Sequence, residues 1–350
     1  MVTTAAALER AIHLAKKATD TGPNPRVGAV LLRDGQIIGE GWHRGAGTPH
    51  AEWVAIEDAK ARGNSPKGAT LVVTLEPCKH DGRTPPCTDL IIASGIHEVV
   101  YACTDSGQQS SGGAEILKAN GVKVEHFPSA EAAELIRIWN AAITNGRPYV
   151  TVKIAASLDG RVAAADGTSQ WITGPESRDH AHLVRSQVGA IAVTTGTVFA
   201  DDPALTARTS NGNLAATQPF RVIVGRRPIP ETAKIWQSGT AAQGLAVQFQ
   251  THNIEKVLAE LEKREVRHVL IEGGPALITA CFKANVVDEI HAYLAPVVIG
   301  NGPTAVSDYG ARTLSAAQRF TTQKVVQLGQ DVLLIARKGA ADFGAASQSL

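Results

Sequence analysis

The sequence predicts two consecutive α/β domains. The chain has 350 residues, a length that suits two domains of ordinary size. Apolar segments of strand length alternate with segments of helical periodicity in both halves, as in layered α/β structures. The segment TNGRP at 144–148 contains turn-forming residues between the two series. We therefore expect one domain over residues 1–146, a second over 147–338 and a flexible tail at 339–350.

The expected elements of the first domain follow from periodicity and turn residues. Apolar residues recur at helical spacing within residues 5–18, which predicts a first helix. Asp34-Gly35 separates two apolar runs and predicts the turn of a β-hairpin. The hairpin strands are expected at 27–32 and 36–42, and the later elements are a helix at 52–62, a strand at 69–75, a helix at 88–94, a strand at 97–103 and a helix at 112–121.

The second domain repeats this alternation with different elements. Strands are expected at 149–160, 221–225, 268–274 and 289–300, and helices at 177–188, 253–264 and 275–285. No G-x-G-x-x-G motif follows the first of these strands, so the pattern does not support a standard dinucleotide-binding fold.

Composition excludes several classes of protein. The net charge is +1 and charged residues make up 19% of the chain, so no basic surplus indicates a nucleic-acid partner. The N-terminal segment lacks the long apolar core and cleavage site of a signal peptide. No run of about 18 apolar residues predicts a membrane span. The four cysteines are too few and too unevenly placed for a disulfide scaffold, so we expect a cytoplasmic protein.

A candidate zinc site carries the clearest chemistry. His50, Cys78 and Cys87 supply the imidazole and thiolate donors of a catalytic site with three protein ligands. Glu52 follows His50 by two residues, where its carboxylate can lie beside the metal and transfer protons without binding it. Zinc deaminases of nucleobases carry H-x-E followed by P-C-x-x-C, and here the second part is stretched to P-C-x8-C. The apolar run after Cys87 places its sulfur at the start of a helix, which favours the thiolate.

Simpler interpretations stand beside this one. The metal could be structural, or the cysteines could be bare thiols. The segment between the cysteines holds Lys79, His80, Arg83 and Thr84, which suit a phosphate-bearing, nucleotide-like substrate. The same segment could equally be a solvated polar loop.

Two features of the second domain indicate a ligand. The segment Glu272-Gly273-Gly274-Pro275 joins a strand to a helix, and its glycines let the backbone approach a ligand at the helix N-terminus. A simple strand–helix turn explains the same residues. Arg226 and Arg227 follow the strand at 221–225, where they could hold the 2′-phosphate of NADP or remain solvated.

Taken together, the motifs resemble those of the bifunctional riboflavin-biosynthesis deaminase–reductases. The resemblance covers roughly residues 5 to 338. It rests on PNPRVGAV (23–30), GWHRGAGTPHAE (41–52), TLEPCKHDGRTPPC (74–87), KIAASLDGR (153–161), SQWIT (169–173), DDPALTAR (201–208) and IEGGPALI (271–278).

The resemblance implies a cytidine-deaminase-like three-layer α/β/α domain followed by a dihydrofolate-reductase-like α/β domain. The first would use Zn²⁺ to deaminate 2,5-diamino-6-(ribosylamino)-4(3H)-pyrimidinone 5′-phosphate. The second would use NADPH to reduce the ribosyl group of the product to ribityl. A homodimer or homotetramer is implied as well, and composition predicts no nucleic-acid or membrane partner.

The resemblance also assigns residues. In the deaminase domain it implies substrate contacts at Asn24, His43, His80, Arg83, Thr84 and Asp105. In the reductase domain it implies a catalytic pair, Lys153 and Glu272, with substrate contacts at Ser169, Arg185, Leu205, Arg208 and Glu272. The cofactor contacts expected there are Ala155, Trp171, Thr197, Asp201, Arg226, Gly274, Pro275, Ala276 and Leu277.

This chain departs from the family pattern after the strand that ends near Cys103. The family usually has Asp-Pro-Asn there, whereas this chain reads Asp105-Ser106-Gly107. The substitution puts a ribose or phosphate contact near Gly107 in doubt, and leaves the zinc chemistry untouched.

Three other functions compete with this one. A nucleic-acid-editing deaminase would need a basic surface and stacking aromatics, but aromatics make up 5% of the chain. A non-enzymatic zinc module would need a fourth protein ligand and no Glu52. A deaminase with a degenerate reductase domain serving oligomerisation is disfavoured by intact Lys153, Asp201 and Glu272.

Overall fold

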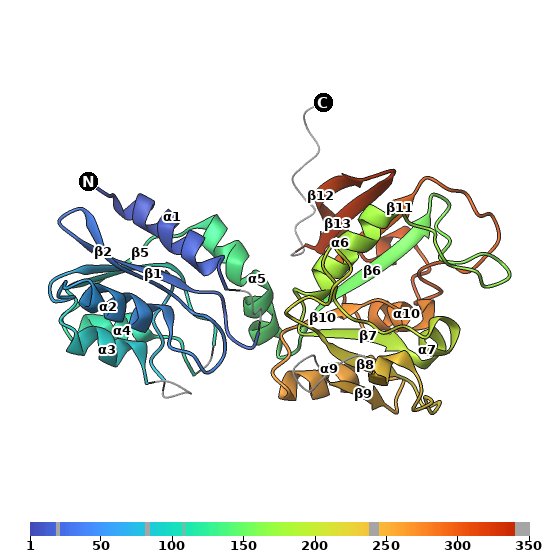
Figure 1. Ribbon diagram of the computed structural model, residues 1–350, viewed down its shortest axis with the longest axis horizontal. Helices are drawn as coiled ribbons and strands as arrows, with labels where there is room; N and C mark the ends of the chain where they lie inside the picture. Colours follow the sequence, from blue (N-terminus) through green and yellow to red (C-terminus); the bar gives the residue numbers. More distant parts are fainter. Residues whose placement is uncertain (19–21, 81–84, 108, 238–244, 340–350) are drawn as a thin grey trace. The chain divides into compact units, whose positions relative to one another are not determined.

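The computed structural model describes residues 1–18, 22–80, 85–107, 109–237 and 245–339. The chain divides into two compact units, Met1–Arg147 and a second that starts at Pro148. Each unit is a sheet with flanking helices, which confirms the predicted fold class (Figure 1).

The first unit contains the predicted hairpin and helices together with two elements that were not expected, β5 and α5. Its elements are α1 (Thr4–Ala15), β1 (Gly28–Arg33), β2 (Gln36–Trp42), α2 (Ala51–Ala61), β3 (Thr70–Leu75), α3 (Cys87–Ala93), β4 (Glu98–Cys103), α4 (Gly113–Ala119), β5 (Lys123–His126) and α5 (Ala130–Asn145).

The sheet of this unit has the order β2-β1-β3-β4-β5. β1 is antiparallel to both β2 and β3, whereas β3, β4 and β5 run parallel. The carboxyl ends of β3 and β4 therefore lie at the same edge of the sheet, where the loops that carry Cys78 and Asp105 begin.

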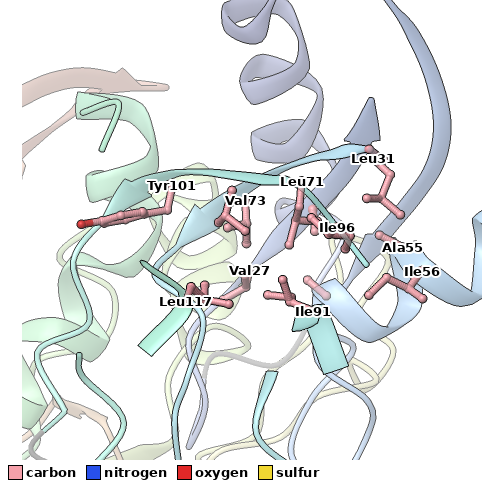
Figure 2. Close-up of a cluster of buried hydrophobic side chains, with 14 of the residues drawn as sticks. Val27, Leu31, Ala55, Ile56, Leu71, Val73, Ile91, Ile96, Tyr101 and Leu117 are labelled. Atoms are coloured by element: carbon pink, nitrogen blue, oxygen red, sulfur yellow. The ribbon is translucent and has the colours of Figure 1, made fainter. Parts of the chain in front are cut away.

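Alternating strand residues cover the two faces of the sheet. Leu31, Leu71 and Val73 pack against residues of α2, α3 and α4 (Figure 2). Val30 and Val72, one position along, pack against α1 and α5 on the opposite face. Period-two alternation with both faces buried produces the three layers of this unit.

Gly28 allows β1 and α1 to approach closely. A Cβ at this position would overlap the carbonyl oxygen of Ala11 on α1. We expect Gly28→Ala to lower the free energy of unfolding by ~1–3 kcal/mol, because the overlap forces helix and strand apart. Urea unfolding measures the effect. Gly196→Ala is the control, since a Cβ there lies 3.4 Å from its nearest neighbour. Equal stability of the two variants would contradict this account.

The second unit holds a larger sheet. Its elements are β6 (Tyr149–Ser157), α6 (Pro175–Arg185), β7 (Ala190–Thr194), α7 (Thr195–Asp201), β8 (Phe220–Val224), α8 (Lys234–Gln237), β9 (Ala246–Phe249), α9 (Ile254–Lys263), β10 (His268–Ile271), α10 (Pro275–Lys283), β11 (Glu289–Ala295), the 3₁₀ turn η2 (Leu314–Ala316), β12 (Phe320–Leu328) and β13 (Asp331–Lys338).

This sheet has the order β12-β13-β11-β6-β10-β7-β8-β9. It is parallel from β11 to β9, and β13 pairs antiparallel with β11 and β12. Residues of α9 and α10 cover one face, whereas α6 and α7 contribute to clusters built on the alternate strand residues. The carboxyl ends of β6, β10 and β7 meet at one edge, where ligands bind in open parallel sheets.

Two segments differ from what the sequence predicts or lie largely outside the described residues. The strand expected at 289–300 ends at Ala295, because Pro296 has no N–H to continue the ladder. The expected tail at 339–350 lies outside the described residues except for Gly339. Among the described residues, no helix combines the length and apolarity needed to cross a bilayer.

Candidate active sites

The ends of secondary-structure elements bring three metal-ligating side chains together in the first unit. His50 directly precedes α2, Cys87 is the first residue of α3, and Cys78 lies in the loop after β3. The ligand atoms of these three residues lie within 4.8 Å of one another, and both cysteines are buried.

The spacing of these atoms fits zinc. His50 Nδ1 lies 3.2 Å from Cys87 Sγ and 3.6 Å from Cys78 Sγ. A tetrahedral zinc with ligands at ~2.0–2.3 Å holds neighbouring ligand atoms roughly 3.5 Å apart. One imidazole and two thiols at these separations form a site with three protein ligands, the number typical of catalytic zinc.

The electrostatics of the cluster agree with a metal site. Hydrogen bonds from Cys87 and then from His50 lower the pKa of Cys78 to about 4, against the effect of burial. Glu52, in the first turn of α2, is 4% exposed, and burial raises the pKa of its carboxyl. A hydrogen bond with Cys78 and then burial raise the pKa of the Cys87 thiol, so Cys78 is the thiolate of the metal-free cluster. A carboxyl with a raised pKa beside this thiolate is suited to accept and return a proton.

A hydrogen-bond chain sets the tautomer of a neighbouring histidine. His43 Nδ1 donates a hydrogen bond of 3.1 Å to the carbonyl oxygen of Pro49, which directly precedes His50. Its Nε2 accepts from the side-chain amide of Asn24 at 3.0 Å. The His43 ring stands edge-on to that of His50, with centroids 5.3 Å apart. The resemblance implies substrate contacts at both Asn24 and His43, and in the structure these two side chains are in contact beside the metal cluster.

The remaining substrate residues expected in this unit have different surroundings. Asp105 is buried, its Oδ1 accepts the N–H of Gly107 at 2.8 Å, and burial raises the pKa of its carboxyl. His80 is half-buried and follows the Cys78 loop. Arg83 and Thr84 lie outside the described residues.

A cavity of about 880 Å³ lies at the carboxyl edge of the second sheet. Ile271 pairs with Val152, so Glu272 follows β10 at the level of Lys153 on β6, and both residues line the cavity. Its volume falls in the upper part of the range of ~300–1,000 Å³ found for small-molecule sites.

Glu272 is the centre of a charged cluster in this cavity. Arg185, at the end of α6, donates two hydrogen bonds to the Glu272 carboxylate, from Nε and Nη2, each of 2.7 Å. Lys153 Nζ lies 3.9 Å from the same carboxylate. The third nitrogen of the guanidinium, Nη1, donates to the carbonyl oxygen of Thr206 at 3.1 Å. The guanidinium of Arg185 is therefore directed at Glu272 and the backbone.

Burial and charge act in opposite directions on these groups. Burial alone would raise the pKa of Glu272, but the charges of Arg185 and Lys153 outweigh it and hold the pKa at about 2. Burial lowers the pKa of the Lys153 ammonium, and Glu272 partly opposes that effect. Glu272 is therefore a permanent anion near neutral pH, and Lys153 is the group with a proton to give.

The glycine pair after Glu272 packs against the turn that begins α7. A Cβ at Gly273 would lie 2.9 Å from Thr197 Oγ1, and one at Gly274 2.9 Å from Thr194 Oγ1. Thr194 caps α7 through the N–H of Thr197 at 3.1 Å. This close approach brings the N-termini of α7 and α10 to one wall of the cavity, which suits a phosphate-bearing cofactor.

Comparison with known proteins gives the family. The cytidine and deoxycytidylate deaminase zinc-binding region matches residues 1–103, and the RibD C-terminal domain matches residues 148–334. Riboflavin biosynthesis protein RibD of Mycobacterium tuberculosis is 43% identical over 317 residues, covering 90% of this chain and 91% of the relative. The chain belongs to the RibD family.

Two solved structures share the whole architecture of this RibD-family chain. Acinetobacter baumannii RibD, form 1, has a TM-score of 0.85 at 36% identity and covers 96% of this chain and 99% of its own. The diaminohydroxyphosphoribosylaminopyrimidine deaminase/5-amino-6-(5-phosphoribosylamino)uracil reductase of Thermotoga maritima has a TM-score of 0.85 at 33% identity, with the same two coverages. The chain is thus a bifunctional enzyme with a zinc-binding deaminase domain and an NADPH-dependent RibD reductase domain.

Most residues expected in the reductase site of this RibD-family chain line the cavity. These are Lys153, Ala155, Ser169, Trp171, Arg185, Thr197, Asp201, Leu205, Glu272, Gly274, Pro275 and Ala276. Three others do not line it. Leu277 is buried in α10, Arg208 is exposed and donates to the Gly212 carbonyl at 2.7 Å, and Arg226 is exposed after β8.

The sequence interpretation missed residues that the structure places in these sites. His182 lines the cavity and its Nδ1 donates to Thr206 O at 3.1 Å, the carbonyl that Arg185 also contacts. The sequence could have indicated His182, because residues three apart on a helix lie on the same face and His182 is three residues before Arg185. In the deaminase domain the missed residue is the buried Glu76, which directly precedes Pro77 and Cys78.

Proposed function

We propose that this RibD-family enzyme first deaminates 2,5-diamino-6-(ribosylamino)-4(3H)-pyrimidinone 5′-phosphate and then reduces the ribosyl group with NADPH. The final product is 5-amino-6-(5-phospho-D-ribitylamino)uracil. One observation carries the proposal: a single chain holds both the His50, Cys78 and Cys87 cluster and a cavity centred on Lys153 and Glu272. The name of the T. maritima relative joins the same two activities.

In the deamination, Glu52 is the proton-transfer group. When bound by His50, Cys78 and Cys87, zinc supplies a Lewis acid that lowers the pKa of water to near 7. The buried Glu52 carboxylate accepts a proton and returns it to the departing nitrogen, so that ammonia leaves as the exocyclic amine is replaced. Asn24 and His43 hold the pyrimidine through the hydrogen-bond chain that ends at Pro49.

In the reduction, Lys153 is the proton donor, and the negative charge of Glu272 helps Lys153 to stay protonated. NADPH supplies the hydride. The ammonium of Lys153 gives the balancing proton to the opened ribosyl group, and the anionic Glu272 offsets part of the burial effect that lowers the pKa of Lys153. Arg185 fixes the Glu272 carboxylate through two hydrogen bonds and the Thr206 carbonyl through a third, so one N–H on Nη1 and one on Nη2 are left for a substrate contact.

A deaminase with a degenerate reductase domain is the alternative. The intact Arg185–Glu272 pair speaks against it, because a buried ion pair without a use is costly to retain. We also propose a cytoplasmic homodimer or homotetramer, as the family resemblance implies. Mass measurement in solution tests the assembly.

The proposed function is tested by incubating zinc-loaded protein with the diaminopyrimidinone ribosyl phosphate. Without NADPH, the substrate mass should rise by about one unit, because an amine is replaced by oxygen. With NADPH, a further rise of about two units is expected from hydride and proton. The first step alone would support the alternative of a degenerate reductase domain. No change with folded, zinc-replete protein would rule out this substrate.

A further inference from the structure

Glu76 is a buried carboxylate that the proposed mechanism does not use. It follows β3 directly and precedes Pro77 and Cys78. It is 7% exposed, and it is not among the residues whose ligand atoms form the metal cluster. A buried carboxylate is costly unless both of its oxygens are hydrogen-bonded.

Each oxygen of Glu76 accepts a backbone N–H from a different segment. Oε2 accepts from Asp105 at 3.2 Å, two residues after β4, and Oε1 accepts from Ala114 at 3.0 Å, in the first turn of α4. The carboxylate therefore bridges the loop that carries a metal ligand to the loop that carries Asp105. Hydrogen bonds to an ionised acceptor are roughly twice as strong as neutral ones.

Backbone contacts reinforce the same bridge. The N–H of Glu76 donates to Cys103 O at 2.8 Å, and the N–H of Lys79 donates to Ser110 O at 3.2 Å. At Gly113 a Cβ would overlap the carbonyl oxygen of Pro77. The segment from Glu76 to Lys79 therefore lies directly against residues 103–107 and 109–113.

Both cysteine ligands depend on this segment. The Cys78 carbonyl oxygen accepts the N–H of Thr88 at 3.2 Å, the residue after Cys87. A shift of the Cys78 backbone therefore changes its own sulfur and the start of α3 together. A connected path runs from Asp105 through Glu76 to Cys78 and on to Cys87.

We propose that Glu76 is a positioning residue that holds Cys78 in its metal-binding geometry and fixes Asp105 relative to the metal. This inference rests on the proposed zinc-dependent deaminase function, which it deepens. Residues that orient metal ligands typically contribute 10- to 100-fold to metal affinity or activity.

Glu76→Gln tests the role with little change in volume. The glutamine side chain has one acceptor oxygen, so its NH₂ group faces one of the two N–H donors. Glu98→Gln is the matched control, because Glu98 lies in the same sheet but bonds Thr70 and Lys123 away from the metal cluster. Glu76→Asp keeps the charge and shortens the reach, and provides a milder variant if glutamine prevents folding.

Zinc affinity is measured on the full chain by competition with a chromogenic chelator, and ligand geometry by the absorption spectrum of the cobalt-substituted protein. We expect Glu76→Gln to bind zinc about 10- to 100-fold more weakly with a changed cobalt spectrum. Glu76→Asp should show a smaller loss, and Glu98→Gln should match the unmodified protein. In deamination assays at saturating zinc, KM should rise in Glu76→Gln because Asp105 is released.

Unchanged zinc affinity and cobalt spectrum in Glu76→Gln, or in Glu76→Asp if only that variant folds, would overturn the proposal. It would also be overturned if the loss of affinity merely paralleled a loss of thermal stability in the zinc-free protein. Zinc and cobalt binding need no pyrimidine substrate. If the unmodified protein fails to deaminate this substrate, the proposed function is wrong. The zinc and cobalt measurements still test whether Glu76 positions Cys78.

Discussion

We expect Glu52→Gln to deaminate its substrate far more slowly than the unmodified enzyme, while zinc binding and reduction stay intact. The amide cannot accept a proton near neutral pH, and general acid–base catalysis contributes typically 10²–10⁴-fold, so we expect turnover to fall by at least ~100-fold. Glu52 is not among the metal-ligating residues, which are His50, Cys78 and Cys87. Zinc content should therefore stay at the unmodified level, as measured by metal analysis of the purified variant.

The control for this change lies on the same helix. Glu57 is half exposed and pairs with Lys60 at 2.8 Å, so Glu57→Gln alters the charge of α2 without reaching the metal cluster. Supplying the deaminated intermediate with NADPH measures reduction independently. Substantial deamination by Glu52→Gln, or loss of zinc together with activity, would contradict the proton-transfer role.

Local chemistry explains which elements could be predicted from the sequence. The Asp34-Gly35 turn joins β1 and β2 as expected, because both residues adopt the positive φ that this turn requires. The helix expected at 253–264 is observed as α9, and Asn253 caps it by accepting the N–H of Lys256 at 2.9 Å. In both cases the determining interactions join residues close in sequence.

Pairing between distant segments could not be predicted in the same way. β12 at the sheet edge is mostly exposed on both faces, so it has no apolar alternation to reveal it. Its place beside β13, and that of β13 beside β11, depends on hydrogen bonds across the sheet. β5 is also an edge strand with mostly exposed residues. These two edge strands are specified by their partners more than by their own sequence.

The two candidate sites also differ in whether residues close in sequence or distant from each other form them. The residues proposed to bind zinc stand at the ends of predicted elements, in motifs whose donor chemistry can be read directly. The pairing of Arg185 with Glu272 joins residues 87 positions apart, and no local pattern indicates it. The resemblance implied a substrate contact at Arg185, and the structure adds a carboxylate partner, Glu272, that the sequence did not indicate. Arg226, expected to contact the cofactor from its position after β8, is exposed and is not among the residues that line the cavity.

Replacing Glu272 by glutamine is expected to reduce the reductase turnover by up to ~10²–10⁴-fold, the usual contribution of a positioned proton-transfer group, because Lys153 depends on Glu272 to keep its proton. The change removes the anion 3.9 Å from Lys153 Nζ and leaves the Arg185 cation without its ionic partner. Burial lowers the pKa of Lys153, Glu272 raises it and Arg185 lowers it. Without Glu272 only the lowering influences remain, so Lys153 loses its proton at a lower pH than in the unmodified enzyme.

The pH profile separates this electrostatic role from a loss of structure. Activity that requires protonated Lys153 falls as the pH rises through its pKa, so the alkaline limb of kcat should move to lower pH in Glu272→Gln. Glu289→Gln is the matched control. Glu289 is equally buried and pairs with Arg337 at 2.9 Å, but it is not among the residues that line the cavity. A lowered kcat with an unmoved alkaline limb would show that Glu272 does not act through Lys153, because a damaged fold reduces turnover without shifting the protonation of one ammonium.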